Sequence, residues 1–365
     1  MKKMIALVLC MVLTLGCFAG VASAKGDKVT LYVYNWGQYI AEGDDDSIDV
    51  IAAFEEAYPN IKVKYSTYDS NESMYAKLSG GGITVDVIIP SDYMIGRMRQ
   101  EGMLQELNYD NIPNAQYIDP SFRGMAYDPE DKYSVPYTWG TVGIIYNTKY
   151  VDEADVTGWE LLWNEKYADK ILMFDNSRDA FGIAEYLLGY DVNTTDEAEL
   201  KACADKLAEQ KPVVQQYVMD QIFDAMENEE AWIAPYYAGD YLTMLDNNPD
   251  LKFVVPKEGS NWFVDAMCVL KTAQHKEEAE AWINFIASTE SNLANMDYIG
   301  YASPNLEALE GYPAYYEETY GEPLDEERYE IMAAPDEVLA RCELYTNLPA
   351  DTLTLYNDLW TELGI

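Results

Sequence analysis

Four short segments of the sequence carry aromatic, acidic or small polar side chains close together: residues 36–39, 91–93, 175–179 and 236–240. A carboxylate neutralises the charge of an ammonium group, and an aromatic face attracts the cation and contacts its methylene groups. A carboxylate that is buried without a positive partner costs several kcal/mol. The repetition of one chemistry in separate segments therefore predicts a site for a small organic cation.

Two aromatic–acid pairs add to this pattern. Phe263 and Asp265 alternate in an extended run, so their side chains point to the same face of a strand. Tyr237 and Asp240 flank a small loop in the fourth segment. Each pair offers an apolar surface beside a negative charge, which is what an alkyl ammonium group requires.

Residues 32–39 read YVYNWGQY, in which an alternating strand gives way to an irregular segment. Trp36 and Tyr39 are predicted to form two walls for an aliphatic chain. Gly37 lies between them and lets the backbone approach a ligand closely. Gln38 offers a neutral polar contact at one end of the site.

The sequence lacks the residues and motifs of most enzymes. His275 is the only histidine and begins a predicted helix, so histidine-dependent nucleophilic or metal chemistry has no source. No phosphate-binding loop, dinucleotide-binding motif, nucleophile elbow or C-x-x-C pair occurs. Two carboxylates suffice for a glycosidase, so a secreted carboxylate-dependent glycoside hydrolase stays open as an alternative. We otherwise expect that the protein is not an enzyme and binds neither a metal ion nor a cofactor.

A binding protein for another small solute, such as an amino acid or an opine, is the second alternative. The carboxylate of such a ligand needs a cation in the cleft, and Arg178 is the one candidate in these segments. Arginine also commonly pairs with nearby acids in a structural role.

The composition is strongly acidic, with Asp+Glu 64, Lys+Arg 24 and a formal net charge of -40. Such a surface repels nucleic acid and anionic membranes, so both are excluded as partners. The length of 365 residues and a hydrophobic content of 49% allow two domains with a sizeable core. Beyond the N-terminal segment, Cys203, Cys268 and Cys342 are too widely spaced to form a disulfide framework or a metal motif.

Residues 1–24 are predicted to form a signal peptide. Lys2 and Lys3 precede a long apolar run, and an A-S-A sequence that ends at Ala24 is a good cleavage site. Lipoprotein processing at Cys17 is the alternative. Either cut places the mature chain outside the cytoplasm, and no later stretch of sequence is long enough to span a membrane.

Strands and helices are predicted to alternate along the mature chain. Extended runs such as VTLYVY, IKVKYSTY and VDVIIPS each precede a helical pattern, the first of which we expect Ser47 to cap. This alternation is typical of a parallel sheet. Two extended runs, YSVPYTWGTVGIIYN and WFVDAMCVLK, indicate crossovers between two lobes. Ligands of open parallel sheets bind outside the carboxyl ends of the strands, where the four segments are expected to lie.

Six sequence segments resemble those of the bacterial polyamine-binding proteins, the extracytoplasmic subunits of spermidine/putrescine ABC transporters. They are YNWGQYI, YSTYDSNESMYAKL, DVIIPSDYMIGRMRQEGML, YSVPYTWGTVGIIYN, YYAGDY and IGYASPN, and they run in order from about Val29 to about Asn305. The resemblance implies an α/β, two-lobe periplasmic-binding-protein fold, type II-like, with mostly parallel sheets and a ligand cleft between the lobes. It further implies capture of putrescine or spermidine and delivery to an ABC permease, and we expect a monomer.

The two crossovers divide the chain into discontinuous lobes. We expect lobe 1 to contain residues 25–136 and 264–305. Lobe 2 is expected to contain residues 137–263 and 306–365.

The resemblance also implies which residues bind the ligand. Asp179 and Asp265 match acids that hold amines, and Asp240 matches an aspartate of putrescine-preferring members. The full predicted set is Trp36, Gly37, Gln38, Tyr39, Ser91, Tyr93, Asp179, Tyr237, Asp240, Phe263, Asp265 and Tyr301. A further contact is expected near Tyr345 or Thr346.

Four positions depart from the family pattern. Gln38 and Asn176 stand where the family has acids, and Tyr237 and Phe263 stand where it has stacking tryptophans. One end of the site is therefore expected to be less anionic than in spermidine-preferring members. The sequence does not decide which polyamine is preferred.

Overall fold

The computed structural model describes residues 28–43 and 47–365, so the predicted cleavage sites at Ala24 and Cys17 lie outside the described residues. The strands are β1 (Val29–Trp36), β2 (Ile61–Tyr68), β3 (Val87–Ile88), β4 (Ser134–Asn147), β5 (Ile171–Phe174), β6 (Val214–Val218), β7 (Ile233–Tyr237), β8 (Leu251–Val254), β9 (Ser260–Val269) and β10 (Cys342–Glu343). The helices are α1 (Val50–Ala57), α2 (Asn71–Ser79), α3 (Asp92–Gln100), α4 (Ser177–Leu188), α5 (Glu197–Gln210), α6 (Ile222–Glu227), α7 (Ala238–Asn247), α8 (Lys276–Ile286), α9 (Thr289–Ile299), α10 (Leu306–Tyr320), α11 (Glu326–Met332), α12 (Asp336–Leu339) and α13 (Ala350–Leu363).

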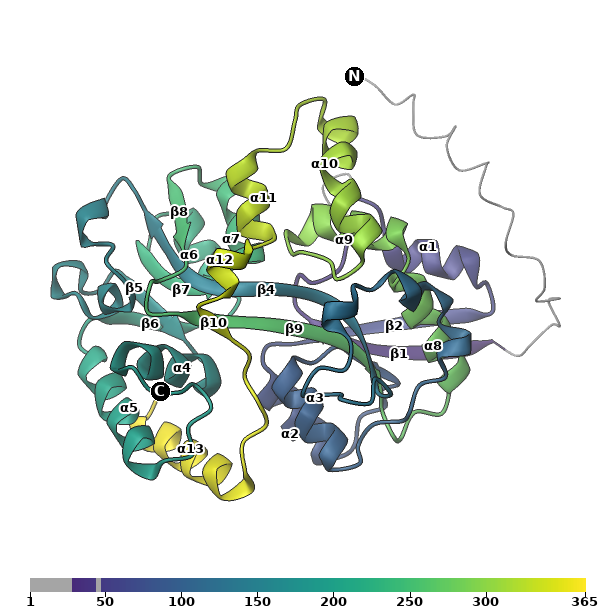
Figure 1. Ribbon diagram of the computed structural model, residues 1–365, viewed down its shortest axis with the longest axis horizontal. Helices are drawn as coiled ribbons and strands as arrows, with labels where there is room; N and C mark the ends of the chain where they lie inside the picture. The colour runs from purple at the N-terminus through teal and green to yellow at the C-terminus, as the bar shows by residue number, and fades with distance from the viewer. Residues whose placement is uncertain (1–27, 44–46) are drawn as a thin grey trace.

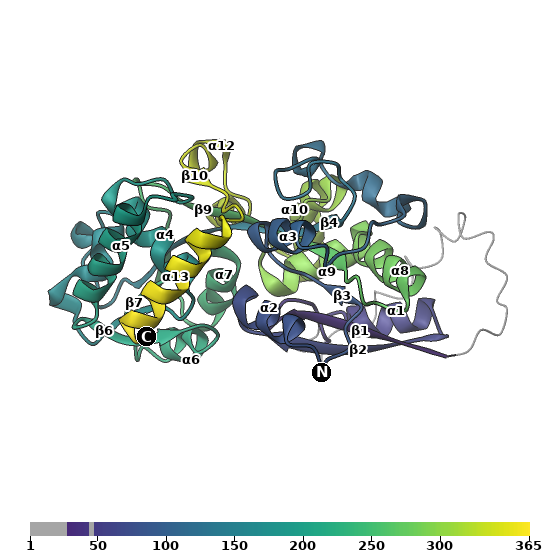
Figure 2. The ribbon, with the colours of Figure 1, turned by 90° about the horizontal axis from the view of Figure 1, so that it is seen from below.

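The molecule has two sides that are joined by long strands (Figures 1 and 2). We call them the β1 side, built on β1, β2 and β3, and the β5 side, built on β5, β6 and β7. The strand order in the described residues is β2-β1-β3-β9-β4-β7-β5-β6, with β8 beside β4 and β10 beside β9. Pairing is parallel within the β1 side and within the β5 side. The mostly parallel α/β fold predicted from the alternation of strands and helices is therefore confirmed.

β4 and β9 are the two predicted crossovers, and they pair with each other in antiparallel fashion. The first part of β4 pairs with β9, from Ser134 opposite Cys268 to Thr141 opposite Trp262. From Val142 onward, β4 pairs with β7 and β8 on the β5 side. All 14 residues of β4 are buried, so its backbone polar groups must be paired along the whole strand, which ties the two sides together.

The helix that follows β1 starts later than the sequence pattern indicates. Asp49 is the N-cap of α1, and its carboxylate accepts a hydrogen bond from the Ala52 amide at 2.7 Å. Ser47 instead accepts a hydrogen bond from the Gly43 amide at 3.2 Å. The prediction of Ser47 as the cap is wrong because an aspartate, which caps equally well, stands two residues closer to the helix.

The C-terminal part of the chain contacts both sides. α10 packs against α9, and α11 packs against α7 (Figure 1). Between β10 and α13 the chain passes α3, where Asn347 Nδ2 donates to Gln100 Oε1 at 3.0 Å. In the same stretch the rings of Tyr345 and Tyr93 meet edge-on, with centroids 6.1 Å apart. α13 then packs against α4 and α5, so this segment is a further link between the two sides.

Two apolar clusters form the core. Trp159 is fully buried in the larger cluster, and Trp282 packs edge-on against Phe54 in the smaller one, at 5.0 Å between centroids. The sulfhydryls of residues 203, 268 and 342 are buried and form no disulfide with one another. Within residues 28–43 and 47–365, no helix combines the length and apolar character needed to cross a bilayer.

A buried aspartate holds the loop that leads into β4. The carboxylate of Asp128, which is 2% exposed, accepts hydrogen bonds from the amides of Lys132, Tyr133 and Ser134 and from the Ser134 hydroxyl. This loop sets where β4 begins and therefore helps to position the crossover.

Asp128→Ala should lower the free energy of unfolding by about 2–4 kcal/mol, because it leaves several buried donors without an acceptor. Urea denaturation of the ligand-free protein measures the loss. Asp110→Ala is the matched control, since Asp110 is exposed, and it should change stability by less than about 0.5 kcal/mol. Equal losses in the two variants would contradict the role assigned to Asp128.

Candidate ligand-binding site

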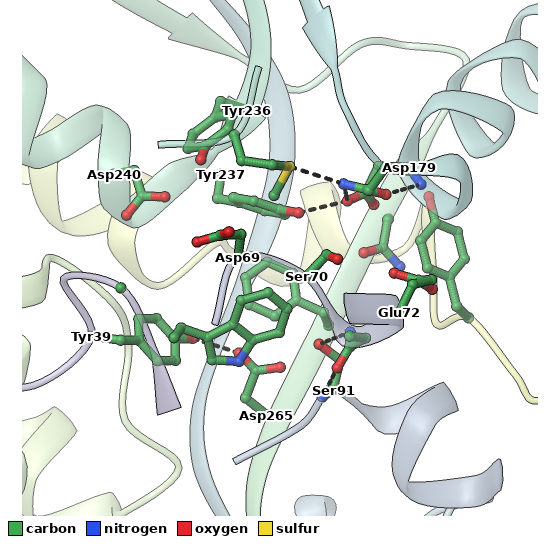
Figure 3. A pocket seen from close by; sticks show the side chains of 18 of the residues that line it. Tyr39, Asp69, Ser70, Glu72, Ser91, Asp179, Tyr236, Tyr237, Asp240 and Asp265 are labelled. Carbon is green, nitrogen blue, oxygen red and sulfur yellow. Dashed lines mark hydrogen bonds between the residues drawn. The ribbon is translucent and has the colours of Figure 1, made fainter. Parts of the chain in front are cut away.

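The carboxyl ends of the parallel strands meet at one pocket between the two sides. β1, β2 and β3 end on one wall of it, and β5, β6 and β7 end on the other. The pocket encloses about 720 Å³, its open mouth included. Figure 3 shows acidic and tyrosine side chains from both walls pointing into this space. The strand-end arrangement expected for an open parallel sheet is therefore present on both sides at once.

Most of the predicted site residues line this pocket: Trp36, Gly37, Tyr39, Ser91, Tyr93, Asp179, Tyr237, Asp240, Phe263, Asp265 and Tyr301. Gln38 is exposed instead and has a φ of 48°, in the left-handed region. It does not line the pocket, and its contact with a ligand stays a prediction.

Asp265 comes from the middle of β9 and is 3% exposed. Its Oδ2 accepts a hydrogen bond from the Tyr39 hydroxyl at 2.7 Å, and that hydroxyl lies 2.5 Å from Thr138 Oγ1 on β4. Its Oδ1 has no hydrogen-bond partner among the described residues. Because an unpaired buried carboxylate oxygen is costly, Oδ1 is a ready acceptor for a cationic group.

Asp179 lies in the first turn of α4 and is held on several sides. The N-cap residue Asn176 accepts a hydrogen bond from the Asp179 amide and donates to Asp179 Oδ2, both at 2.9 Å. The Tyr237 hydroxyl donates to the same oxygen at 2.5 Å. In the sequence, Asn176 was notable only because it stands where the family pattern has an acid. In the structure it positions the neighbouring carboxylate of Asp179.

The opposite wall is organised by Asn71, the first residue of α2. Its Nδ2 donates to Ser91 Oγ at 3.0 Å and to the Tyr93 hydroxyl at 3.1 Å, while its Oδ1 accepts from the Ser91 amide at 3.2 Å. The Tyr93 hydroxyl donates in turn to Glu72 Oε1 at 2.8 Å. One amide side chain thus fixes a serine, a tyrosine and, through the tyrosine, a carboxylate.

The aromatic walls are equally constrained. Trp36 Nε1 donates to the Ile89 carbonyl at 2.8 Å, and its ring packs against that of Tyr68 at 4.7 Å between centroids. The rings of Tyr237 and Phe263 meet edge-on at 5.5 Å. Rings fixed in this way offer an apolar surface at no further cost in side-chain entropy when a ligand binds.

The Asp, Glu, Lys, Arg and His residues in the described lining of the pocket are all acidic. Its acidic residues are Asp69, Glu72, Asp92, Asp179, Asp220, Asp240 and Asp265. No lysine, arginine or histidine stands among the described lining residues, and no group of acids, cysteines and histidines in the described chain is arranged to hold a metal ion. An anionic ligand would meet like charges without a counter-ion, so the pocket selects for a cation.

Arg178 does not supply the missing positive charge. Its guanidinium stacks on Tyr345 at 4.4 Å from the ring centroid and donates to Asn193 Oδ1 at 2.8 Å and to the Tyr356 hydroxyl at 3.4 Å. Tyr345 lines the pocket, whereas Arg178 lies behind it. The arginine required for an amino acid or opine ligand is therefore not in the pocket.

Burial raises the pKa of several acids that line the pocket, among them Asp220, Asp240 and Asp265. The pKa of Asp265 rises to about 6 and that of Asp240 to about 8, with the charges of Asp179 and Asp220 respectively adding to the effect of burial. The pKa of Asp220 is also raised by burial, and then by the charge of Asp69. An ammonium group nearby would oppose these shifts, since an opposite charge favours the ionised form.

The residues that follow β2 and β6 are not among those predicted from the sequence. Residues 69–72 and 219–220 line the pocket from opposite sides. The rule that ligands bind at the carboxyl ends of parallel strands would have pointed to both segments, because β2 and β6 are parallel strands like their neighbours. Tyr345, suspected as a late contact, is among the lining residues, and Thr346 is not.

The sequence matches the family model of the bacterial extracellular solute-binding proteins over residues 49–319. The match includes strands from both sides of the pocket. The chain belongs to this family.

Relatives of this solute-binding protein include periplasmic proteins named for binding polyamines. The spermidine/putrescine-binding periplasmic protein of Salmonella typhimurium is 34% identical over 297 residues, which cover 81% of this chain and 82% of the relative. The putrescine-binding periplasmic protein SpuD of Pseudomonas aeruginosa is 28% identical over 95% of each chain. The solved structure of the spermidine/putrescine ABC transporter substrate-binding protein PotD of Streptococcus pneumoniae has a TM-score of 0.73 and 35% identity, covering 92% of this chain and 98% of its own. The two-lobe binding-protein fold is thereby confirmed.

The raised pKa of Asp265 predicts how the stability of the ligand-free protein depends on pH. Its folded-state pKa of about 6 lies above the value of about 3.9 for an unfolded aspartate, so the folded state binds more protons and stability falls as the pH rises between these values. Asp265→Asn removes this loss. At a pH of about 7.5 the variant should be more stable than the parent by about 1–2 kcal/mol, and the difference should vanish near pH 4.

Urea denaturation at both pH values measures the difference, with Asp110→Asn as the exposed control. A variant that is less stable than the parent at the higher pH would contradict the destabilising effect assigned to the ionised Asp265 carboxylate.

Proposed function

We propose that this protein captures a polyamine, putrescine or spermidine, in the pocket between its two sides and delivers it to an ABC permease. One observation supports this function most directly: the pocket gathers acids from both sides, and its described lining includes no basic residue. A polyamine brings at least two ammonium groups separated by methylenes, which matches carboxylates spaced among aromatic rings. The family match and the polyamine-binding relatives support the same function.

The predicted site residues divide into two roles in this proposal. Asp265 Oδ1 accepts one ammonium group, since Tyr39 already occupies the other oxygen. Asp179, braced by Tyr237 and Asn176, accepts another. The rings of the lining aromatic residues contact the methylenes between the two.

Acids outside the predicted set of site residues bear on the choice of polyamine. Gln38 and Asn176 suggested a less anionic end, but Asp69, Glu72 and Asp220 add carboxylates to the pocket. A third ammonium group, as in spermidine, would therefore also meet negative charge. The proposal accordingly includes both polyamines.

The alternatives fit the pocket less well. A ligand with a carboxylate would need Arg178, which lies behind Tyr345. A glycoside hydrolase would need two carboxylates on either side of a bond, whereas the relatives that match this chain are substrate-binding transport proteins. We therefore propose a receptor without catalytic activity.

The two-lobe division predicted from the sequence gives the proposed mechanism. Residues 25–136 with 264–305 and residues 137–263 with 306–365 would rotate about β4 and β9 and close on the ligand. The N-terminal segment would direct export, by cleavage after Ala24 or by lipid attachment at Cys17. We propose that the closed monomer is the form that docks on the permease.

A matched series of ligands tests the charge argument. Putrescine and spermidine should bind in calorimetric titration, whereas 4-aminobutyrate, in which a carboxylate replaces one ammonium group, should bind at least about 100-fold more weakly because like charges then face each other. The uncharged 1,4-butanediol is the control for the contribution of the methylenes. Binding of 4-aminobutyrate as tight as that of putrescine would rule out the proposed function.

Closure should be visible in solution. Saturating putrescine should reduce the radius of gyration measured by small-angle scattering, because ammonium groups bridge acids of the two sides. The scattering of the protein with 4-aminobutyrate at the same concentration is the control. An unchanged radius with bound putrescine would refute the hinge.

A further inference from the structure

Gly239, the second residue of α7, lies against the ring of Tyr301. An ideal Cβ at position 239 would come within 2.2 Å of Tyr301 Cδ2 and 2.3 Å of Cε2. Carbon atoms do not approach to such distances, since non-bonded carbons are stable at about 3.5–4.0 Å. No side chain of any kind at residue 239 is therefore compatible with the observed position of the ring.

The backbone gives no reason for a glycine at this position. Gly239 has no positive φ and lies in a helix, where alanine is more favourable than glycine by about 1 kcal/mol. The three atoms nearest to an ideal Cβ at residue 239 all belong to the ring of Tyr301. Gly239 therefore leaves a space, which we call the socket, that this wall of the pocket occupies.

Tyr301 is closed in on its other sides. It is 3% exposed, and its ring meets Tyr39 and Phe263 edge-on at 5.1 and 6.0 Å between centroids. Its opposite edge faces Gly140 on β4, where an ideal Cβ would lie 3.2 Å from Tyr301 Cδ1. Because Tyr39 and Phe263 already contact the ring and the ring lines the pocket, the space of the pocket is available to a ring that is displaced from Gly239.

The chain that carries the ring is also fixed. The Trp139 amide donates to the Ala302 carbonyl at 3.0 Å, which holds the residue after Tyr301 on β4. Gly300, with a φ of 73°, packs on the carbonyl of Gly239, 2.6 Å from its own ideal Cβ. Any group added at residue 239 thus acts on the ring more readily than on the backbone.

We propose that Gly239 is a specificity-determining residue: by holding Tyr301 back from the pocket, it sets the width available to the ligand chain. This inference rests on the proposed function, since the ligand is taken to be a linear amine. A wider pocket accepts a branched chain, and a narrower one accepts only an unbranched chain.

The experiment compares putrescine with 1,4-diaminopentane, which carries one additional methyl branch, in calorimetric titrations of the parent and Gly239→Ala. The displaced ring should lower the affinity for the branched amine about tenfold more than the affinity for putrescine, the scale of one methylene in an apolar pocket. Gly311→Ala is the matched control, because Gly311 also lies in a helix and nothing stands within 4 Å of its ideal Cβ. It should leave both affinities unchanged.

A general loss of structure would lower both affinities alike, and that result, or no change, would overturn the inference. In the Tyr301→Ala background, Gly239→Ala should no longer alter the ratio of the two affinities. If the single variant does not fold, recovery of folding in Gly239→Ala/Tyr301→Ala supports the socket, and failure of the double variant overturns it. A parent that binds no amine would refute the proposed function, whereas a parent that binds putrescine with an unchanged ratio in Gly239→Ala would refute this inference alone.

Discussion

Carboxylates that face one another in a partly buried pocket repel, and this protein directs seven of them into one such space without a basic side chain among the described lining residues. Burial, and then the charge of a neighbouring acid, raises the pKa of Asp240 to about 8 and that of Asp265 to about 6, which favours the protonated carboxyl group. A ligand that brings ammonium groups replaces protons with fixed positive charges. Affinity and selection for cations then come from the same arrangement.

The fold places these charges so that one ligand can contact both sides. Asp69 and Glu72 follow β2 on the β1 side, while Asp179 and Asp220 follow β5 and β6 on the β5 side. β4 and β9 join the two sides through shared hydrogen bonds, and β9 also carries Asp265. A cation bound between these walls contributes attraction to both, which couples binding to closure in the proposed mechanism.

The sequence was most informative where structure is local. Alternation along one strand predicted that Phe263 and Asp265 share a face, and both line the pocket. It was least informative where the pocket depends on distant contacts. Asp220 can be recognised as a pocket residue once β6 is known to be a parallel strand beside β5, and the importance of Gly239 depends on a ring that belongs to the segment after α9. The N-cap of α1 was misassigned because two good capping residues, Ser47 and Asp49, stand close together, and side-chain geometry decides between them.

Asp265 Oδ1, which has no hydrogen-bond partner among the described residues, offers the most direct test of the proposed binding mode. The measurement is a crystal structure of the protein with putrescine. We expect an ammonium nitrogen within about 3 Å of Asp265 Oδ1, with the Tyr39 hydroxyl still hydrogen-bonded to Oδ2 and the methylenes lying along the aromatic walls. A bound amine whose nitrogen atoms both lie away from Asp265, with Oδ1 facing carbon atoms or remaining unpaired, would contradict the proposed binding mode.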